Sequence, residues 1–392
     1  MKKKIIFVAM RLAQGGTERT LVEALDVIDY DLYDVTLYSR KNALYFLPRV
    51  NKNVHVIIND TCPQYENTGY YKFLSGVVKL SKRLRLKGLK KSVERKQRNY
   101  LLTKRRLYEK KTYFSDGVVY DLAISYDMGK ECAIFTDLYV DAKEKYTFLH
   151  SSDLESTKFD AFAKFDKIIG VNSGVSDNVE SVYPHLKDKL AAVENFISPE
   201  TITDMVDECH ADCQTKESYE ICTCGGLNRV KGQDVAIKAA KILSDEGCRF
   251  HWTLVGDGDK RGELEDLIRQ CGLEDKVTIT GFQTNPYTYM NECDVYVQPS
   301  KEEAHATTLI EALILCKPIV STNTIAGTYI LSKYPGGLLV DIDEQMLADR
   351  VRYLMENVDA RQKLVDDAKS IDWEARRAEY ANDVNRMLAG QI

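Results

Sequence analysis

The chain has 392 residues, with 54 lysines and arginines against 59 aspartates and glutamates, so its formal net charge is −5. The length is about twice that of a usual domain and predicts two domains. The acidic balance argues against a general nucleic-acid binder, and the sequence contains no apolar run long enough to span a bilayer.

The N-terminal residues MKKKIIFVAM combine a basic start with a short apolar run. They lack the small-residue cleavage site of a signal peptide, so we expect a buried first strand. Ten cysteines without an export signal indicate reduced thiols rather than disulfides. These features predict a cytoplasmic protein.

Short apolar runs alternate with helical patterns along the first half of the chain. Strands are expected at residues 4–10, 34–39, 53–58, 121–126, 145–150 and 167–172. Helices are expected at residues 17–28 and 173–183. This alternation is typical of a parallel sheet that is covered by helices on both faces.

A basic segment at residues 72–112 interrupts the alternation, and its only acids are Glu94 and Glu109. An apolar stripe recurs there at helical spacing, formed by Phe73, Val77, Leu80 and Leu84. The cations beside or opposite the stripe are Lys72, Lys79, Lys82, Arg83 and Arg85. The pattern predicts a helical insertion at about residues 70–113 that lies on an anionic membrane surface. The alternatives are a solvated helical hairpin that covers the first domain and an RNA-binding segment.

The second half of the chain repeats the strand and helix pattern. Strands are expected at residues 219–226, 250–258, 276–282, 293–300 and 318–323, and helices at 233–243 and 261–272. Two such sheets cannot share one core at this length, so we expect two doubly wound domains with a boundary in the polar residues 195–216. Ligands of open parallel sheets bind at the carboxyl ends of the strands, which predicts a site in the cleft between the domains.

Residues 225–232 form the first candidate anion site. A predicted strand ends in Gly225 and Gly226, and Lys231 with Gly232 leads into a helix. Such a turn presents backbone N–H groups and a lysine to an anion at the positive end of the helix. A glycine turn with a surface lysine is also common without any ligand, so this stretch alone leaves both interpretations open.

The stretch around Glu303 and Glu311 supplies a second candidate. Glu303, His305, Thr307 and Thr308 lie in a loop that leads into a helix, and Glu311 follows about one turn into that helix. The helix start offers N–H groups, while a carboxylate accepts paired hydrogen bonds from a vicinal diol. The alternative is that Glu303 is solvated and Glu311 only favours a helix N-terminus.

The ordered set of motifs resembles the family 4 retaining glycosyltransferases, which have the GT-B fold. AQGGTERTLVEAL resembles the family's N-terminal Gly-Gly-x-Glu-Arg turn and helix, FLHSSD its acceptor-domain histidine loop, and GGLNRVKG its phosphate turn. LVGDG, VTITGF, the Glu303 and Glu311 pair and KPIVSTNTIAG follow in the family's order. The resemblance covers nearly the whole chain.

The resemblance implies an α/β protein of two doubly wound, Rossmann-like parallel-sheet domains that face a cleft. Residues 1–198 would bind the acceptor, residues 199–370 would bind the donor, and residues 371–392 would form a helix that crosses back to the first domain. The implied activity is retaining transfer of a hexose from a nucleotide sugar, by family frequency a UDP-sugar, to a polysaccharide or lipid-linked glycan in cell-surface glycan biosynthesis. With its basic insertion, such an enzyme would be peripheral on the inner face of the cell membrane.

The resemblance also assigns roles to residues. Lys231 would bind the donor diphosphate, Glu311 the ribose and Glu303 the donor sugar, and His150 would face the reacting carbon. The implied catalytic residues are therefore His150, Glu303 and Lys231. The implied donor-binding residues are Gly15, Gly16, Gly226, Arg229, Lys231, Phe282, Glu303, Ala304, His305, Ala306, Thr307, Thr308, Leu309 and Glu311. Of these, Gly15 and Gly16 would allow a close approach to the phosphates, Thr308 and Leu309 would supply N–H groups, and Phe282 would lie near the base. For His150, a packed histidine at a strand end is the alternative.

Two positions depart from the family's pattern. Gly226 stands where the family has an arginine, so Arg229 or Arg19 would have to supply that charge. Ala304 stands where the family has a glycine, which narrows the backbone freedom beside the sugar. Both departures bear on the identity of the donor.

No cofactor or metal is expected, because Lys231 and the helix-start N–H groups can stabilise a leaving diphosphate electrostatically. Asp257 and Asp259 lie in a glycine turn, and Cys209, His210 and Cys213 lack a second ligand pair, so neither predicts a metal site. Two other functions stay open: a nucleotide-sugar 2-epimerase of the same fold, and a glycosyltransferase-like partner subunit that binds glycan without turnover.

Overall fold

The computed structural model describes residues 1–13, 15–40, 44–59, 68–83, 87–114, 117–127, 130–151, 162–206 and 217–392. The chain divides into two compact units. The first comprises Met1–Phe148 and Lys158–Ile168, and the second comprises Leu149–Thr157 and Ile169–Ile392.

The first sheet has seven strands in the order β3-β2-β1-β4-β5-β6-β7, and β1 to β5 pair in parallel. Its strands are β1 (Lys3–Val8), β2 (Tyr33–Arg40), β3 (His55–Asn59), β4 (Tyr120–Ser125), β5 (Ala142–Leu149), β6 (Lys167–Gly170) and β7 (Leu190–Ala192). Residues 5–8 of β1 have no exposed surface. A central parallel strand is buried on both faces, which explains why β1 appears in the sequence as a continuous apolar run.

Helices and short 3-10 turns connect these strands. They are α1 (Gly16–Asp26), η1 (Leu47–Arg49), α2 (Gly69–Arg83), α3 (Lys87–Tyr113), α4 (Lys130–Tyr139), α5 (Ser173–Val182) and η4 (Pro184–Lys189), and α6 (Pro199–Thr203) follows β7. The strands and helices predicted for the first half of the chain are thereby confirmed, and β7 is an additional strand.

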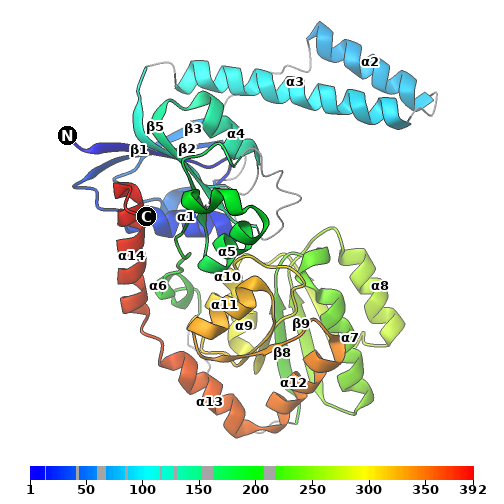
Figure 1. The fold of residues 1–392 in the computed structure, drawn as a ribbon. Helices are drawn as coiled ribbons and strands as arrows, with labels where there is room; N and C mark the ends of the chain where they lie inside the picture. Colours follow the sequence, from blue (N-terminus) through cyan, green and yellow to red (C-terminus); the bar gives the residue numbers. More distant parts are fainter. Residues whose placement is uncertain are drawn as a thin grey trace. The chain divides into compact units, whose positions relative to one another are not determined.

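The basic segment forms a helical hairpin, α2 and α3, which extends away from the first sheet (Figure 1). Leu74 of α2 and Val93 of α3 are buried. The rings of Tyr70 and Tyr100 lie 4.9 Å apart, and Gln97 Nε2 donates to Ser75 Oγ at 2.7 Å. These contacts show that the predicted helical insertion folds as an antiparallel pair.

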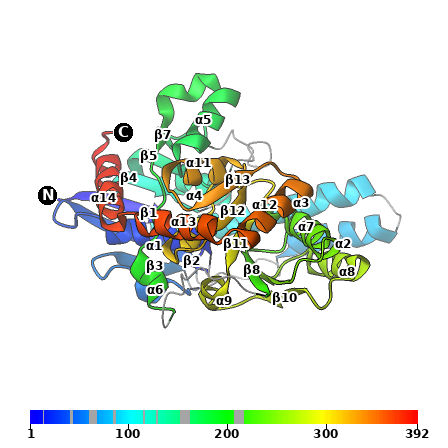
Figure 2. The same ribbon diagram turned by 90° about the horizontal axis from the view of Figure 1, so that it is seen from below.

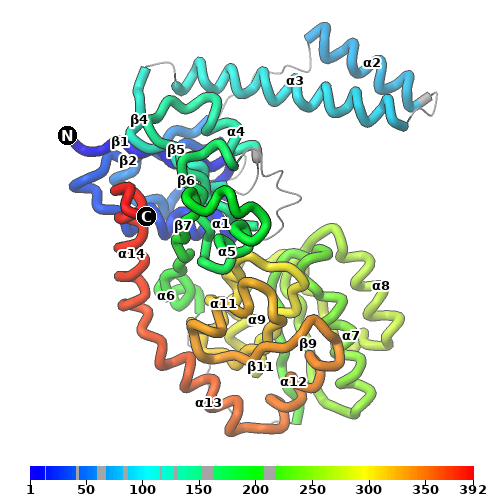
Figure 3. The backbone as a smooth tube through the Cα atoms, viewed as in Figure 1, coloured from blue at the N-terminus to red at the C-terminus, as the bar shows by residue number. Residues whose placement is uncertain are grey.

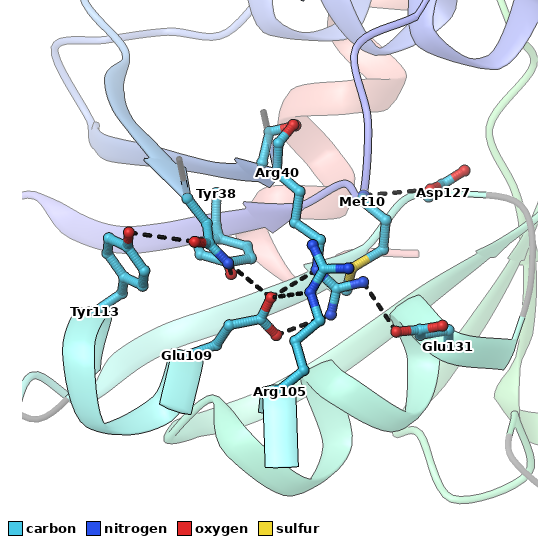
Figure 4. Close-up of polar contacts among 10 residues, drawn as sticks. Met10, Tyr38, Arg40, Arg105, Glu109, Tyr113, Asp127 and Glu131 are labelled. Carbon is cyan, nitrogen blue, oxygen red and sulfur yellow. Dashed lines mark hydrogen bonds and ion pairs between the residues drawn. The ribbon is translucent and has the colours of Figure 1, made fainter. Parts of the chain in front are cut away.

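A buried ion pair attaches α3 to the first sheet (Figure 4). Glu109, which has no exposed surface, accepts from Arg40 Nε at 2.7 Å and from Arg40 Nη2 at 2.8 Å. Asn59 Nδ2 and Arg105 Nε donate to the same carboxylate at 2.7 Å and 3.1 Å, and Arg40 Nη1 donates to Glu131 at 2.8 Å. Since Arg40 and Asn59 end β2 and β3, the network fixes the base of the hairpin at the carboxyl ends of these strands.

The second sheet has six parallel strands in the order β10-β9-β8-β11-β12-β13. They are β8 (Tyr219–Cys224), β9 (Phe250–Val255), β10 (Val277–Gly281), β11 (Val295–Gln298), β12 (Ile319–Thr322) and β13 (Gly337–Val340). The connecting elements are η5 (Arg229–Lys231), α7 (Gln233–Asp245), α8 (Arg261–Cys271), α9 (Tyr287–Glu292), α10 (Thr307–Ile314), α11 (Ile325–Lys333) and α12 (Glu344–Glu356). The predicted elements of this half are also confirmed.

Two apolar clusters form the core of the second unit. One joins α7, α8 and α12 to the sheet around the fully buried Trp252, with α7 and α12 side by side (Figure 2). The other joins α9, α10 and α11 to the sheet. The helices therefore cover both faces of the sheet, as the strand and helix alternation predicts.

The chain ends in two helices, α13 (Val358–Lys369) and α14 (Trp373–Ala389), which Figure 3 traces in succession. The rings of Tyr380 and Phe196 stack 5.6 Å apart. Glu194 accepts from Tyr334 Oη at 2.9 Å and from Lys333 Nζ. The predicted C-terminal helix is confirmed, whereas its crossing to the first domain and the boundary at residue 198 stay predictions.

Candidate functional site

The candidate site lies at the carboxyl ends of β8 and β11, where two loops meet. The loop after β8 contains η5, and the loop after β11 leads into α10. Lys301 N donates to Val230 O at 2.7 Å, which joins the two loops through their backbones. Gly232 has φ of 68°, and a Cβ there would lie 1.9 Å from Pro299 O, so only glycine fits this contact.

Lys231 and Glu303 form an ion pair across these two loops. Their side chains are 26% and 12% exposed. Asn228 caps η5 by accepting from Val230 N and Lys231 N, which positions the lysine. The structure therefore brings together the residue predicted to bind the diphosphate and the residue predicted to bind the sugar.

The N-terminal end of α10 is a second part of the site. Ala306 provides no side-chain cap, so the first N–H groups of the helix have no side-chain acceptor at this position. Thr308 Oγ1 donates to Gln298 Oε1 at 2.9 Å, and Gln298 Nε2 donates to Ser300 Oγ at 2.8 Å. The N–H group of Leu309, one of the predicted phosphate ligands, donates to Ala306 O at 3.0 Å.

Glu311 lies one turn further along α10 and is buried, with 6% of its surface exposed. Its neighbours Leu309, Ile310 and Ala312 belong to the apolar core of this unit. A carboxylate is costly at such a position unless hydrogen bonds satisfy it. The Glu303 side chain is only 12% exposed, so the alternative of a solvated Glu303 is not confirmed, while the role of Glu311 stays a prediction.

His305 lies in the same loop, between Glu303 and Ala306. Both of its ring nitrogens are shielded from solvent and lack a hydrogen-bond partner among the described residues. Burial lowers the pKa of His305 to about 4, so the ring is neutral at pH 7. A neutral imidazole has one donor and one acceptor nitrogen, which suits an uncharged polar group.

Two contacts that the sequence did not predict hold this loop in place. Asn172 Nδ2 donates to Ala304 O at 2.7 Å, and Ala326 N donates to Glu303 O at 3.1 Å. Asn172 is fully buried and also caps α5 through Val175 N. The Asn-Ser-Gly start of a predicted helix was a capping signal, but the bond to Ala304 spans 132 positions and has no local signal.

Three other predicted donor ligands lie at the surface or lack a side chain. Arg229 is 78% exposed and pairs with Glu302 at 3.3 Å, and Phe282 is 60% exposed. Gly226 O accepts from Gln233 Nε2 at 3.1 Å. Arg229 therefore does not provide a buried positive charge in place of the arginine that the family has at the position of Gly226.

The glycine turn of the first unit lies against a carboxylate. Gly15 is the N-cap of α1 and Gly16 is its first residue, and a Cβ on Gly15 would lie 2.4 Å from Glu18 Oε2. Glu18 is buried and pairs with Arg11 at 2.7 Å, and burial raises the pKa of its carboxyl group. The close approach of Gly15 and Gly16 to a phosphate stays a prediction.

His150 directly follows β5 and is half-buried. Ser152 and Asp153, which end the FLHSSD loop, lie outside the described residues, so the role of His150 stays a prediction. Cys209, His210 and Cys213 also lie outside them. Within the described ranges, no group of three or more His, Cys, Asp or Glu residues is placed to hold a metal ion.

Residues 210–371 match the protein family described as glycosyl transferases group 1. The N-acetylgalactosamine-N,N'-diacetylbacillosaminyl-diphospho-undecaprenol 4-alpha-N-acetylgalactosaminyltransferase of Campylobacter jejuni is 26% identical over 58% of this chain and 61% of its own length. The lipopolysaccharide core biosynthesis glycosyltransferase LpsD of Rhizobium meliloti is 30% identical over 39% of this chain and 44% of its own. The chain thus matches less than two thirds of the length of these relatives.

A solved structure resembles the chain over nearly its whole length. HepE of Anabaena, crystallised in complex with UDP and glucose, superposes with a TM-score of 0.66 at 16% identity, over 99% of this chain and 98% of that one. The likeness in fold confirms the predicted GT-B architecture of two Rossmann-like domains.

Proposed function

We propose, because the chain carries a group 1 glycosyl transferase domain within a GT-B fold, that it transfers a hexose from a nucleotide sugar to a glycan acceptor with retention of configuration. The observation that carries this proposal is the Lys231 and Glu303 ion pair beside the start of α10, with the buried Glu311 in the same helix. A cation, helix N–H groups and two carboxylates provide contacts for a diphosphate, a ribose and a sugar.

The proposed donor is a UDP-sugar. HepE was crystallised with UDP and glucose, which supports this choice. The diphosphate would contact Lys231 and the first N–H groups of α10, and the ribose hydroxyls would donate to Glu311. Glu303 would accept hydrogen bonds from the sugar, and the neutral His305 would bind an uncharged substituent of the sugar.

The chemistry requires stabilisation of a leaving group. Breaking the bond between the anomeric carbon and the diphosphate oxygen places negative charge on the diphosphate. The acceptor hydroxyl bonds to that carbon and passes its proton to the leaving diphosphate oxygen. Lys231 and the helix N–H groups stabilise this charge electrostatically. The proposed reaction therefore needs no metal ion or other cofactor.

The proposed acceptor is a polysaccharide or a lipid-linked glycan in cell-surface glycan biosynthesis. The name of the Campylobacter relative includes diphospho-undecaprenol, and that of the Rhizobium relative includes lipopolysaccharide core biosynthesis. None of the helices in the described ranges is long and apolar enough to cross a membrane. The basic hairpin would hold the enzyme at the inner, anionic face of the cell membrane, where a lipid-linked acceptor is accessible.

A binding and transfer assay tests the proposal. UDP-glucose, UDP-N-acetylglucosamine, GDP-mannose and ADP-glucose are added separately, and the unfolding temperature and nucleotide release are measured. One donor should stabilise the protein, by about 2.7 kcal/mol at 100 times its dissociation constant, and should release its nucleotide only with a glycan acceptor. Donor conversion at C2 without an acceptor would indicate the epimerase instead, and binding without turnover would indicate a partner subunit.

Two lysine variants make the assay specific for the site. Lys231→Ala removes a charge-assisted contact of about 1.5–3 kcal/mol and should weaken UDP binding by about 10- to 100-fold. Lys241→Ala, in an exposed pair with Asp245 on α7, is the matched control and should leave affinity unchanged. Equal UDP affinity of wild type and Lys231→Ala would contradict the diphosphate assignment.

A further inference from the structure

We propose that the outer face of α2 docks on a lipid bilayer with anionic headgroups by inserting a short apolar stripe that has two lysines along one side. Of the predicted stripe, Phe73 and Leu80 are exposed, Val77 is partly buried and Leu84 lies outside the described residues. The exposed stripe therefore consists of Phe73 and Leu80, with Tyr70 at its start. The surface is inferred from the exposed side chains of the hairpin, and only its link to a lipid-linked acceptor rests on the proposed function.

The stripe is exposed although the hairpin has an apolar interface of its own. Phe73 is 65% exposed, Leu80 is 55% exposed and Tyr70 is 50% exposed. They recur at intervals of three and seven residues, which places them along one side of the helix. Leu74 and Ser81, on the side towards α3, are 5% and 1% exposed. The outer stripe is therefore not required for packing of the hairpin.

Cations repeat beside the stripe at the same interval. Lys72 and Lys79 each precede a stripe residue by one position, and both are exposed. The sequence of α2 contains no acidic residue, and α3 contains only Glu94 and Glu109. Glu109 is buried against Arg40 and so does not neutralise the surface. An apolar stripe flanked by uncompensated cations fits the boundary between anionic headgroups and acyl chains.

The hairpin is held so that docking also positions the first sheet. The Tyr70 and Tyr100 rings pack α2 onto the middle of α3, and the Arg40 and Glu109 pair attaches the C-terminal end of α3 to β2. Arg40 lies at the carboxyl end of β2, the edge of a parallel sheet at which ligands bind. A bilayer in contact with α2 would thus set the position of the acceptor-binding edge of the first unit.

Two other binding partners for this surface, RNA and a second copy of the hairpin, agree less well with these observations. RNA would be attracted by the lysines, but it does not require Phe73 and Leu80 to be exposed in line with one another. A second copy of the hairpin would bring like charges together. A bilayer accounts for both the apolar stripe and the cations.

Sedimentation of the full chain with vesicles tests the surface. The vesicles are phosphatidylcholine alone, or phosphatidylcholine mixed with phosphatidylglycerol. Wild type should bind only the mixed vesicles, and less at high salt. The double variants Phe73→Ser with Leu80→Ser, and Lys72→Glu with Lys79→Glu, should each bind at least about tenfold more weakly.

Matched control variants distinguish the loss of this surface from general effects of lower hydrophobicity or lower positive charge. Leu32→Ser with Leu138→Ser removes two leucines that are 58% and 53% exposed elsewhere in the first unit. Lys52→Glu with Lys369→Glu makes the same change in net charge away from the hairpin. Both control variants should bind vesicles as wild type does. If they weaken binding as much as the α2 variants, the proposed surface is wrong.

A fluorescence measurement reports insertion directly. In a Phe73→Trp variant, emission should shift to shorter wavelength with mixed vesicles, whereas wild type should show no such shift. Emission that stays unchanged, or full vesicle binding by the Phe73→Ser and Leu80→Ser variant, would refute insertion of the stripe. Tighter binding to RNA than to mixed vesicles, with no effect of that variant, would assign the hairpin to RNA.

Transfer to a water-soluble acceptor distinguishes this inference from the proposed function. The α2 variants should retain that transfer and lose only transfer to an acceptor in vesicles. If wild type binds vesicles but transfers no sugar, the proposed function fails while the docking surface stands.

Discussion

Lys231 and Glu303 are 72 positions apart in the sequence and meet in one ion pair. A cation held beside a carboxylate is pre-positioned for a donor that has both a diphosphate and a sugar. The pair also means that a change at one residue alters the surroundings of the other, so their contributions to binding are not expected to be additive.

We predict different effects for the two carboxylates of the site. Glu311→Ala should weaken UDP and UDP-sugar binding equally, by about 1.5–3 kcal/mol, because the ribose is common to both ligands. Glu303→Ala should reduce the affinity for UDP-sugar but not for UDP. Calorimetric titration of both ligands into each variant measures this difference. Loss of UDP affinity in Glu303→Ala equal to that in Glu311→Ala would show that their roles are misassigned.

Gly226 allows a test of the missing arginine. A Cβ on Gly226 would have Asn228 Nδ2 at 3.5 Å and Asp257 O at 3.9 Å as its nearest neighbours, which are ordinary contacts. We predict that Gly226→Arg folds and binds UDP about tenfold more tightly, because it adds a charge-assisted contact. Gly232→Ala, whose Cβ would lie 1.9 Å from Pro299 O, should instead destabilise the protein. Unchanged UDP affinity of a folded Gly226→Arg would show that this position does not face the phosphates.

His305 predicts a pH dependence of stability. Its pKa is about 4 in the folded protein and about 6.5 in an unfolded chain. Between these values the unfolded chain binds a proton that the folded protein does not, so the contribution of His305 to stability is complete above pH 6.5 and is lost as the pH falls towards 4. The free energy of unfolding of wild type relative to His305→Leu should therefore fall by roughly 3 kcal/mol from pH 7 to pH 4.

Urea denaturation of wild type and His305→Leu at several pH values measures this dependence. The difference between the two proteins isolates His305 from the other groups that titrate in this range. If the difference stays constant from pH 7 to pH 4, the imidazole titrates equally in both states and its burial does not affect stability.

At the scale of elements, the hairpin depends on one buried carboxylate. Glu109 on α3 accepts hydrogen bonds from Arg40, Arg105 and Asn59 and has no exposed surface. Removing one partner of a buried ion pair leaves an uncompensated charge, which costs about 3–5 kcal/mol. The length of α3 and its basic composition do not reveal this dependence.

We predict that Glu109→Gln lowers the free energy of unfolding by about 3–5 kcal/mol, because the buried Arg40 keeps its charge and only the partly exposed Glu131 still pairs with it. Glu94→Gln is the matched control on the same helix. Glu94 is 45% exposed and lies 3.6 Å from Lys90, so its loss should cost about 0.5 kcal/mol or less. Chemical denaturation measures both variants. Equal stability of the two would mean that the buried network does not hold α3 in place.

At the scale of the whole molecule, the predicted cleft between two domains implies movement. Enzymes that must exclude water from a reaction often close on their substrates. We predict that the radius of gyration of the chain falls when UDP and an acceptor analogue are added together. Small-angle X-ray scattering measures the change. Identical scattering profiles with and without these ligands, at concentrations that saturate binding, would argue against closure.

The sequence by itself determined the class of fold and the position of the motifs. Alternation of apolar runs with helical patterns is a local signal, and it predicted the strands of both sheets except β7 and β13. The helical spacing of apolar residues in the basic segment predicted that this insertion is helical. The loops that contain Lys231 and Glu303 follow directly from this alternation, because ligand sites in parallel sheets lie at the carboxyl ends of strands.

Only the tertiary structure decided which side chains meet. The Lys231 and Glu303 pair, the bond of Asn172 to Ala304 and the Arg40 and Glu109 pair join residues 72, 132 and 69 positions apart. Likewise, Glu109 is buried and Glu94 is exposed, although both are acidic residues of the same basic helix. Such contacts depend on how sheets and helices pack, and a local pattern of residue types contains no information about packing between distant segments.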